Sequence, residues 1–62
     1  MQIALGQRWE MYSARRWVPV VVTKIEDDRV RLRYEGLIEF VTVKLVDMET
    51  KPELFRRART SP

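Results

Sequence analysis

The stretch "DDRVRLRYEG", residues 27–36, carries the clearest strand pattern in the chain. Charged and apolar residues alternate strictly between two turn signals, and successive side chains of a β-strand point to opposite faces. The apolar positions are predicted to face a hydrophobic core: Val30, Leu32 and Tyr34. The basic positions share the opposite face, and we call them the arginine row: Arg29, Arg31 and Arg33. A strand with one solvent-exposed face and one buried face predicts a sheet that covers a core on one side.

The segments on either side of this strand also favour β-structure. Further strands are predicted over residues 7–12, 17–25 and 38–46. A short last strand is predicted near Met48. The run "WVPVVV" at 17–22 is rich in β-branched residues, which favour pleated and packed surfaces. Pro19 lacks a backbone N–H and is therefore expected at an edge or near the start of its strand.

The periodicity changes at the C-terminal end of the chain. Thr50 and Glu53 have the spacing of a capping box, in which each side chain bonds a free backbone N–H of the first helical turn. Three apolar residues lie along one stripe of such a helix: Leu54, Phe55 and Ala58. A short helix over residues 51–59 is therefore predicted to dock this stripe on the sheet.

Short strands and tight turns in a chain of 62 residues predict one small domain, residues 1–62. The predicted fold is mainly β: a small closed barrel of four to five antiparallel strands over residues 3–49, with a short C-terminal helix over 51–59. Closure would remove the open edges that a flat sheet of this size exposes. A chain of about 60 residues buries only about 60% of its unfolded surface, so each large core side chain matters for stability.

The residue types present exclude several kinds of chemistry. The chain contains no cysteine and no histidine, which excludes disulfides, thiolate metal sites and imidazole catalysis. The acidic turn "EDD" at 26–28 lacks the ligand spacing of a calcium loop. The hydroxyl residues have no histidine or cysteine to act as a base, and two isolated glycines do not form a phosphate-binding loop. We therefore expect no catalytic residue, no metal, no cofactor and no enzyme activity.

The formal net charge is +3 but is unevenly distributed. Residues 1–50 hold equal numbers of basic and acidic residues, so the whole excess lies in residues 51–62. No basic leader is visible at the N-terminus, and the apolar run 17–22 is far shorter than the roughly 20 residues that a membrane helix needs. These features predict a cytoplasmic protein without membrane contact. Nine arginines against three lysines suggest a bacterial source with a GC-rich genome.

Four segments together resemble the Tudor domain, one of the SH3-like barrels: "GQRW", "RWVPVVVTKI", "VRLRYEG" and "EFVTV". The matching positions are Gly6, the Trp17–Val18–Pro19–Val20 segment, Tyr34, Gly36, Glu39 and Val41. The resemblance implies an SH3-like barrel. It also implies a site for methylated lysine or arginine, which Tudor domains often hold in a cage of aromatic rings. Val18 and Leu37 stand where that cage has aromatic residues, and only Tyr34 and Tyr12 remain at matching places.

The first functional hypothesis is a non-enzymatic adaptor that binds a protein partner. Its candidate contacts form an aromatic surface: Tyr12, Trp17, Tyr34 and Phe40. In the alternative interpretation such rings fill the core of a small barrel. We expect this of Tyr34, and we expect Phe40 to pack under the C-terminal helix. An interface between two copies would also cover the apolar residues 17–22, so monomer and homodimer both remain open.

The second hypothesis is a nucleic-acid-binding module that contacts phosphates. Its candidate residues are the arginine row and two arginines of the basic C-terminal end: Arg29, Arg31, Arg33, Arg56 and Arg59. The competing interpretation is that the row is solvated and pairs across the sheet with nearby carboxylates: Glu10, Glu26 or Glu39. The charge balance of residues 1–50 favours pairing, whereas the basic end favours a polyanion. We therefore expect a protein partner first and nucleic acid as the alternative.

Overall fold

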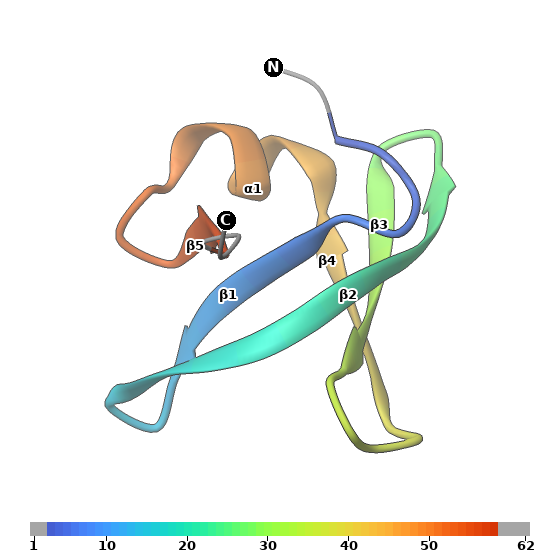
Figure 1. The fold of residues 1–62 in the computed structure, drawn as a ribbon. Helices are drawn as coiled ribbons and strands as arrows, with labels where there is room; N and C mark the ends of the chain where they lie inside the picture. Colours follow the sequence, from blue (N-terminus) through green and yellow to red (C-terminus); the bar gives the residue numbers. More distant parts are fainter. Residues whose placement is uncertain (1–2, 59–62) are drawn as a thin grey trace.

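A computed structural model describes residues 3–58 of the chain. The protein is mainly β, as predicted, with five antiparallel strands and one short helix (Figure 1). The elements are β1 Arg8–Ser13, β2 Arg16–Glu26, β3 Arg29–Tyr34, β4 Phe40–Lys44, α1 Leu45–Thr50 and β5 Phe55–Arg57. Three of the strands lie within one or two residues of their predicted positions, and the fourth predicted strand is shorter than expected because α1 begins at Leu45.

The five strands form one sheet in the order β4-β3-β2-β1-β5. β1 to β4 follow one another as a meander, and β5 returns to pair with β1. Figure 1 shows that α1 connects the end of β4 to the segment that leads into β5. The sheet is curved (Figure 1), but within residues 3–58 no ladder joins β4 to β5. The predicted hydrogen-bonded closure of the barrel is therefore absent. β5 has only three residues, and α1 lies between the two edge strands in the chain.

The core lies on the concave side of the sheet. Its buried side chains are Trp9, Met11, Val20, Val22, Val30, Leu32, Met48 and Phe55. Val30 and Leu32 are fully buried, as their alternation with the arginines predicts, and Tyr34 packs against the core while remaining partly exposed. Every strand except β4 contributes a buried residue, so the core depends on contacts between segments far apart in the sequence.

The predicted C-terminal helix is wrong in position. The helix is α1, one segment earlier, where Met48 is 2% exposed and Leu45 packs against the core. The predicted stretch forms a turn and then β5, and residue 59 lies outside the described residues. Phe55 is buried as expected, but it reaches the core from a strand that pairs with Met11 of β1. The domain's sheet therefore extends beyond the predicted limit of residue 49.

The β1–β2 hairpin has a two-residue turn. Ala14 and Arg15 both have positive φ, 52° and 65°, and Ser13 pairs with Arg16 across them. A turn of this kind needs positive φ at both central residues, which matches the twist of the flanking strands. Neither residue is glycine, so each adopts a conformation that L-residues disfavour. This turn forms one wall of a groove described below.

Candidate functional site

The arginine row lies on the outer face of the sheet, as its alternation predicts. Arg29 and Arg31 are exposed and Arg33 is partly exposed. The register adds two lysines that the sequence did not point to, because Lys44 lies opposite Arg29 and Lys24 lies opposite Arg31. We call these five residues the cationic face: Lys24, Arg29, Arg31, Arg33 and Lys44. Three neighbouring strands thus place basic side chains on one surface.

The carboxylates considered as partners of the row make no ion pair with it within residues 3–58. Glu10 pairs with Arg56 at 2.6 Å between Oε1 and Nε, across β1 and β5. Glu26 lies opposite Arg29 in β2, but its carboxylate pairs with Lys24 at 3.2 Å. Within residues 3–58, four members of the cationic face make no ion pair: Arg29, Arg31, Arg33 and Lys44. The row is therefore an available cationic surface.

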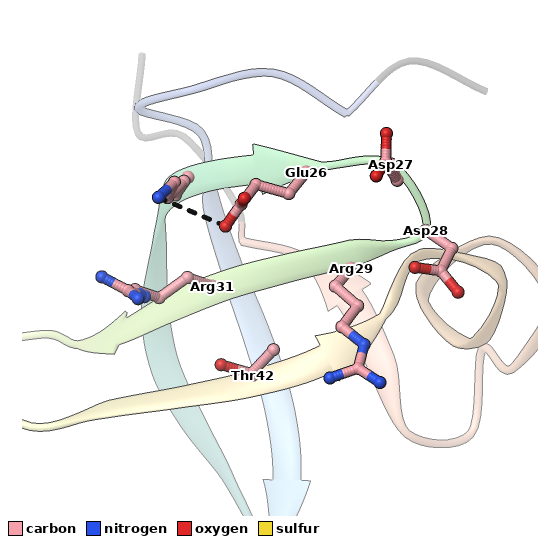
Figure 2. Close-up of a pocket in the computed structure, with 7 residues that line it drawn as sticks. Glu26, Asp27, Asp28, Arg29, Arg31 and Thr42 are labelled. Atoms are coloured by element: carbon pink, nitrogen blue, oxygen red, sulfur yellow. Dashed lines mark ion pairs between the residues drawn. The ribbon is translucent and has the colours of Figure 1, made fainter.

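The cationic face borders a shallow pocket of about 410 Å³ (Figure 2). Its lining residues are Lys24, Glu26, Asp27, Asp28, Arg29, Arg31 and Thr42. Figure 2 shows Arg29 and Arg31 extending from β3, with the acidic turn at one end of the pocket. No group of three or more acidic side chains in the part of the chain that the structure describes could hold a metal ion. The acidic turn therefore limits the cationic surface at that end.

Phe40 borders the row at the opposite end of β4. It lies opposite Arg33, faces outward and is 53% exposed, so the expectation that it packs under a helix is wrong. The guanidinium of Arg31 lies 5.5 Å from the centre of its ring, within the range of a cation–π contact. Arg33 donates a hydrogen bond to the carbonyl of Leu37 at 3.2 Å. An exposed aromatic ring therefore joins the cationic face.

Two other aromatic candidates form a separate cluster at the β1–β2 hairpin. Tyr12 and Trp17 lie opposite each other, with ring centres 5.3 Å apart in an edge-on arrangement. Arg56 covers the Trp17 ring at 3.9 Å and is held there by Glu10. This candidate arginine is thus already engaged, and it does not extend the cationic face. Arg59 lies outside the described residues.

Tyr34 lines a third and distinct place, a groove of about 320 Å³ between the β1–β2 turn and the β3–β4 turn. The groove is lined by Ser13, Ala14, Arg16, Val18, Tyr34, Leu37 and Glu39. Among the described residues that line the groove, Tyr34 is the only aromatic one. The four aromatic candidates therefore occupy three locations.

Arg8 and Glu35 form an ion pair with two hydrogen bonds. Arg8 donates from Nε to Oε2 at 2.8 Å and from Nη2 to Oε1 at 2.6 Å. These hydrogen bonds lower the pKa of Glu35, which the charges of Arg8 and Arg33 lower further, while partial desolvation opposes the shift. The same contact raises the pKa of Arg8. Glu35 thus forms its ion pair with Arg8. The charge of Arg33 acts on Glu35 without an ion pair between the two side chains.

Comparison with protein-family models, with curated proteins and with solved structures finds no match to this chain. In residues 3–58 no helix has both the length and the apolar character needed to span a membrane.

Proposed function

We propose that this chain is a non-enzymatic, SH3-like binding module that holds a single strand of nucleic acid against its cationic face. The observation that carries the proposal is the lack of carboxylate partners for four cations of that face within residues 3–58. Like charges also lie directly opposite each other, Arg29 beside Lys44 and Arg31 beside Lys24. Such pairs destabilise a sheet, and a bound polyanion would neutralise them.

Nucleic acid thus replaces a protein partner as the first-ranked ligand. The sequence left open whether carboxylates pair with the arginine row. In the structure Glu10 pairs with Arg56 and Glu26 pairs with Lys24, so neither pairs with the row. The aromatic candidates, in turn, are dispersed over three places. The unpaired arginines and the dispersed aromatic rings both favour the arginine row as the ligand-binding surface.

The shape of the face favours a single strand over a duplex. Alternate residues of a strand lie about 6.5–7 Å apart, a spacing comparable to that of phosphates along an extended nucleic-acid strand. Phe40 offers a ring on which a base can stack, and Arg31 beside it adds a cation. Reading a duplex requires an element that enters a groove, and α1 has only six residues.

The proposal is tested by fluorescence anisotropy with labelled oligothymidylate and oligouridylate over about 50–200 mM salt. Neutralising three or four phosphates predicts a slope of about −2 to −3 in a plot of log affinity against log salt concentration. The triple variant Arg29→Gln, Arg31→Gln, Arg33→Gln should weaken binding and flatten the slope for both sequences alike, because phosphate contacts do not distinguish bases.

The matched control removes the same charge elsewhere. The variant Arg15→Gln, Arg16→Gln, Lys51→Gln loses three positive charges, two at the β1–β2 hairpin and one directly after α1, and none of them belongs to the arginine row. Circular dichroism checks that both variants fold. If the two variants lose affinity equally, the attraction depends on net charge alone and the cationic face is not the site. Absence of wild-type binding at the lowest salt would also reject the proposal.

A second candidate, a protein adaptor, has its own supporting observation. The β3–β4 turn exposes Leu37 at 51% and Ile38 at 90%, next to Phe40 and the groove. Contiguous exposed apolar side chains often mark a binding surface. A pull-down after nuclease treatment, with wild type and Ile38→Asp, separates the two functions. A partner that survives nuclease and is lost with Ile38→Asp supports the adaptor, whereas loss on nuclease treatment supports nucleic acid.

A further inference from the structure

The two edges of the sheet differ in how well they are protected against pairing. β5 is three residues long, and two of them are arginines. β4 has five residues, and three of its side chains are β-branched, one is aromatic and only the last is charged. Short strands and charges prevent edge-to-edge association, whereas a longer apolar edge invites it. β4 is therefore the edge open to another strand.

The hydrogen-bond pattern shows which groups this edge presents. Tyr34 N–H donates to the Glu39 carbonyl at 3.0 Å, and Leu45 N–H donates to the Asp28 carbonyl at 2.7 Å. Bonded pairs alternate in an antiparallel ladder, and both bonds fit one unbroken register. The odd-numbered residues of β4 therefore bond to β3. The even-numbered residues point their N–H and C=O groups to the open edge: Phe40, Thr42 and Lys44.

We infer that β4 pairs with β4 of a second copy of this chain in antiparallel register, with Thr42 facing Thr42 on a two-fold axis. This inference does not depend on the proposed function. Each edge offers three N–H and three C=O groups in the same alternation, so the two edges satisfy each other. The result is one continuous sheet across both copies, in which no further β4 edge remains free.

The side chains of β4 complement one another in this register. On the outer face, Phe40 lies opposite Lys44 of the second copy, an aromatic ring opposite a cation. On the inner face, Val41 lies opposite Val43 of the second copy. Both valines are only partly buried within one chain, and pairing covers the exposed part of each. No two like charges face each other across the axis, so the pairing adds none of the repulsion that destabilises antiparallel pairs.

The first test is the oligomeric state across a concentration series up to about 1 mM, because small interfaces form weak complexes. Sedimentation should show a monomer–dimer equilibrium that stops at the dimer. Thr42→Pro should abolish the dimer and keep the monomer folded, because the register leaves the Thr42 N–H without a β3 partner and proline is tolerated at such an edge. Circular dichroism reports the fold.

The second test resolves the register. The chain has no cysteine, so Thr42→Cys introduces a single thiol at the two-fold axis. Bonded antiparallel partners have Cα atoms about 5.5 Å apart, within the range for a disulfide. Mild oxidation should cross-link Thr42→Cys at least several times faster than Ser13→Cys, whose thiol lies on the exposed β1–β2 hairpin.

Each remaining outcome counts against the inference. A wild-type chain that stays monomeric throughout the concentration series overturns the proposed dimer. The β4 edge would then be open to a strand of another protein. Species that grow beyond the dimer overturn the closed two-fold arrangement. Equal cross-linking rates for the two cysteine variants would show contact without the proposed register, and a dimer that persists in Thr42→Pro would place the interface elsewhere.

Discussion

Arg29 and Lys44 lie directly opposite each other across β3 and β4, and neither makes an ion pair within residues 3–58. Glu26 flanks Arg29 on β2 but is bonded to Lys24, and Lys44 is on the sheet edge. Like charges opposite each other destabilise an antiparallel pair by about 0.2–1 kcal/mol. The fold thus tolerates a small electrostatic cost at the place where we propose that an anion binds.

Lys44→Gln should therefore stabilise the free protein. At low salt and micromolar concentration, its melting temperature should rise by roughly 1–8 °C, since 1 kcal/mol corresponds to about 4–8 °C in a domain of this size. The gain should shrink with added salt, which screens exposed charges. Lys51→Gln is the control, because Lys51 pairs with Asp47 and its removal relieves no repulsion. A lower melting temperature for Lys44→Gln would contradict the repulsion.

Phe40→Leu tests the stacking contribution to the proposed binding. Leucine keeps an apolar side chain but removes the ring, and stacking of one base on an aromatic side chain is worth about 1–3 kcal/mol. Affinity for oligothymidylate should therefore fall about 5- to 150-fold, by titration at fixed salt. The salt slope should stay the same, because no cation is removed. Leu37→Ala, a change at another exposed apolar residue, should have little effect; equal losses would point to an apolar contact without stacking.

The alternation within residues 29–34 was sufficient to predict both the arginine row and the buried face of β3. The full cationic face was not predictable in this way. Lys24 joins it through a register shift between Val22 and Lys24, and Lys44 joins it through the pairing of β3 with β4. Cross-strand register depends on turn geometry and bulges, which alternation along a single strand does not encode.

The C-terminal segment shows where local signals fail. The spacing of Thr50 and Glu53 fits a capping box, yet Thr50 ends α1, with its hydroxyl donating to the Val46 carbonyl at 2.6 Å. A three-residue strand is too short to show a period, and β5 forms because Phe55 enters the core beside Met11. Tertiary burial therefore overrides the helical spacing here.

Phe55→Ala should severely destabilise the domain. The ring is 7% exposed and holds β5 against the core, so its removal should cost about 3–5 kcal/mol. Natural domains are stable by only about 5–15 kcal/mol, and a chain this short is expected near the lower limit. Urea denaturation measures the loss. Arg57→Ala, an exposed change in the same strand, should cost much less; equal costs would mean that β5 contributes through its charges and not through burial.

Glu35 should titrate below the ordinary carboxyl range. The Arg8 contact lowers its pKa, so the stabilisation is present above the ordinary value of about 4.3 and is lost as the pH falls through the lowered pKa. The effect on stability should be small, because the pair is exposed to solvent. Carbon NMR of the side-chain carboxyl should show the pKa rising toward its ordinary value in Arg8→Gln. It should stay unchanged in Arg15→Gln, and a shift in that variant would point to long-range charge instead.

The groove between the β1–β2 and β3–β4 turns should bind trimethyl-lysine peptides weakly or not at all. The resemblance to Tudor domains implies an aromatic cage, but Val18 and Leu37 line the groove beside Tyr34. A cation over an aromatic face gains about 0.5–1 kcal/mol at an exposed site, so the double variant Val18→Phe, Leu37→Tyr should improve affinity by about 5- to 30-fold. Adding Tyr34→Leu should remove most of that gain, and an unmodified lysine peptide should show less of it. Saturable micromolar binding to the wild type, with NMR shifts centred on Tyr12 and Tyr34, would show instead that two tyrosines suffice to hold the cation.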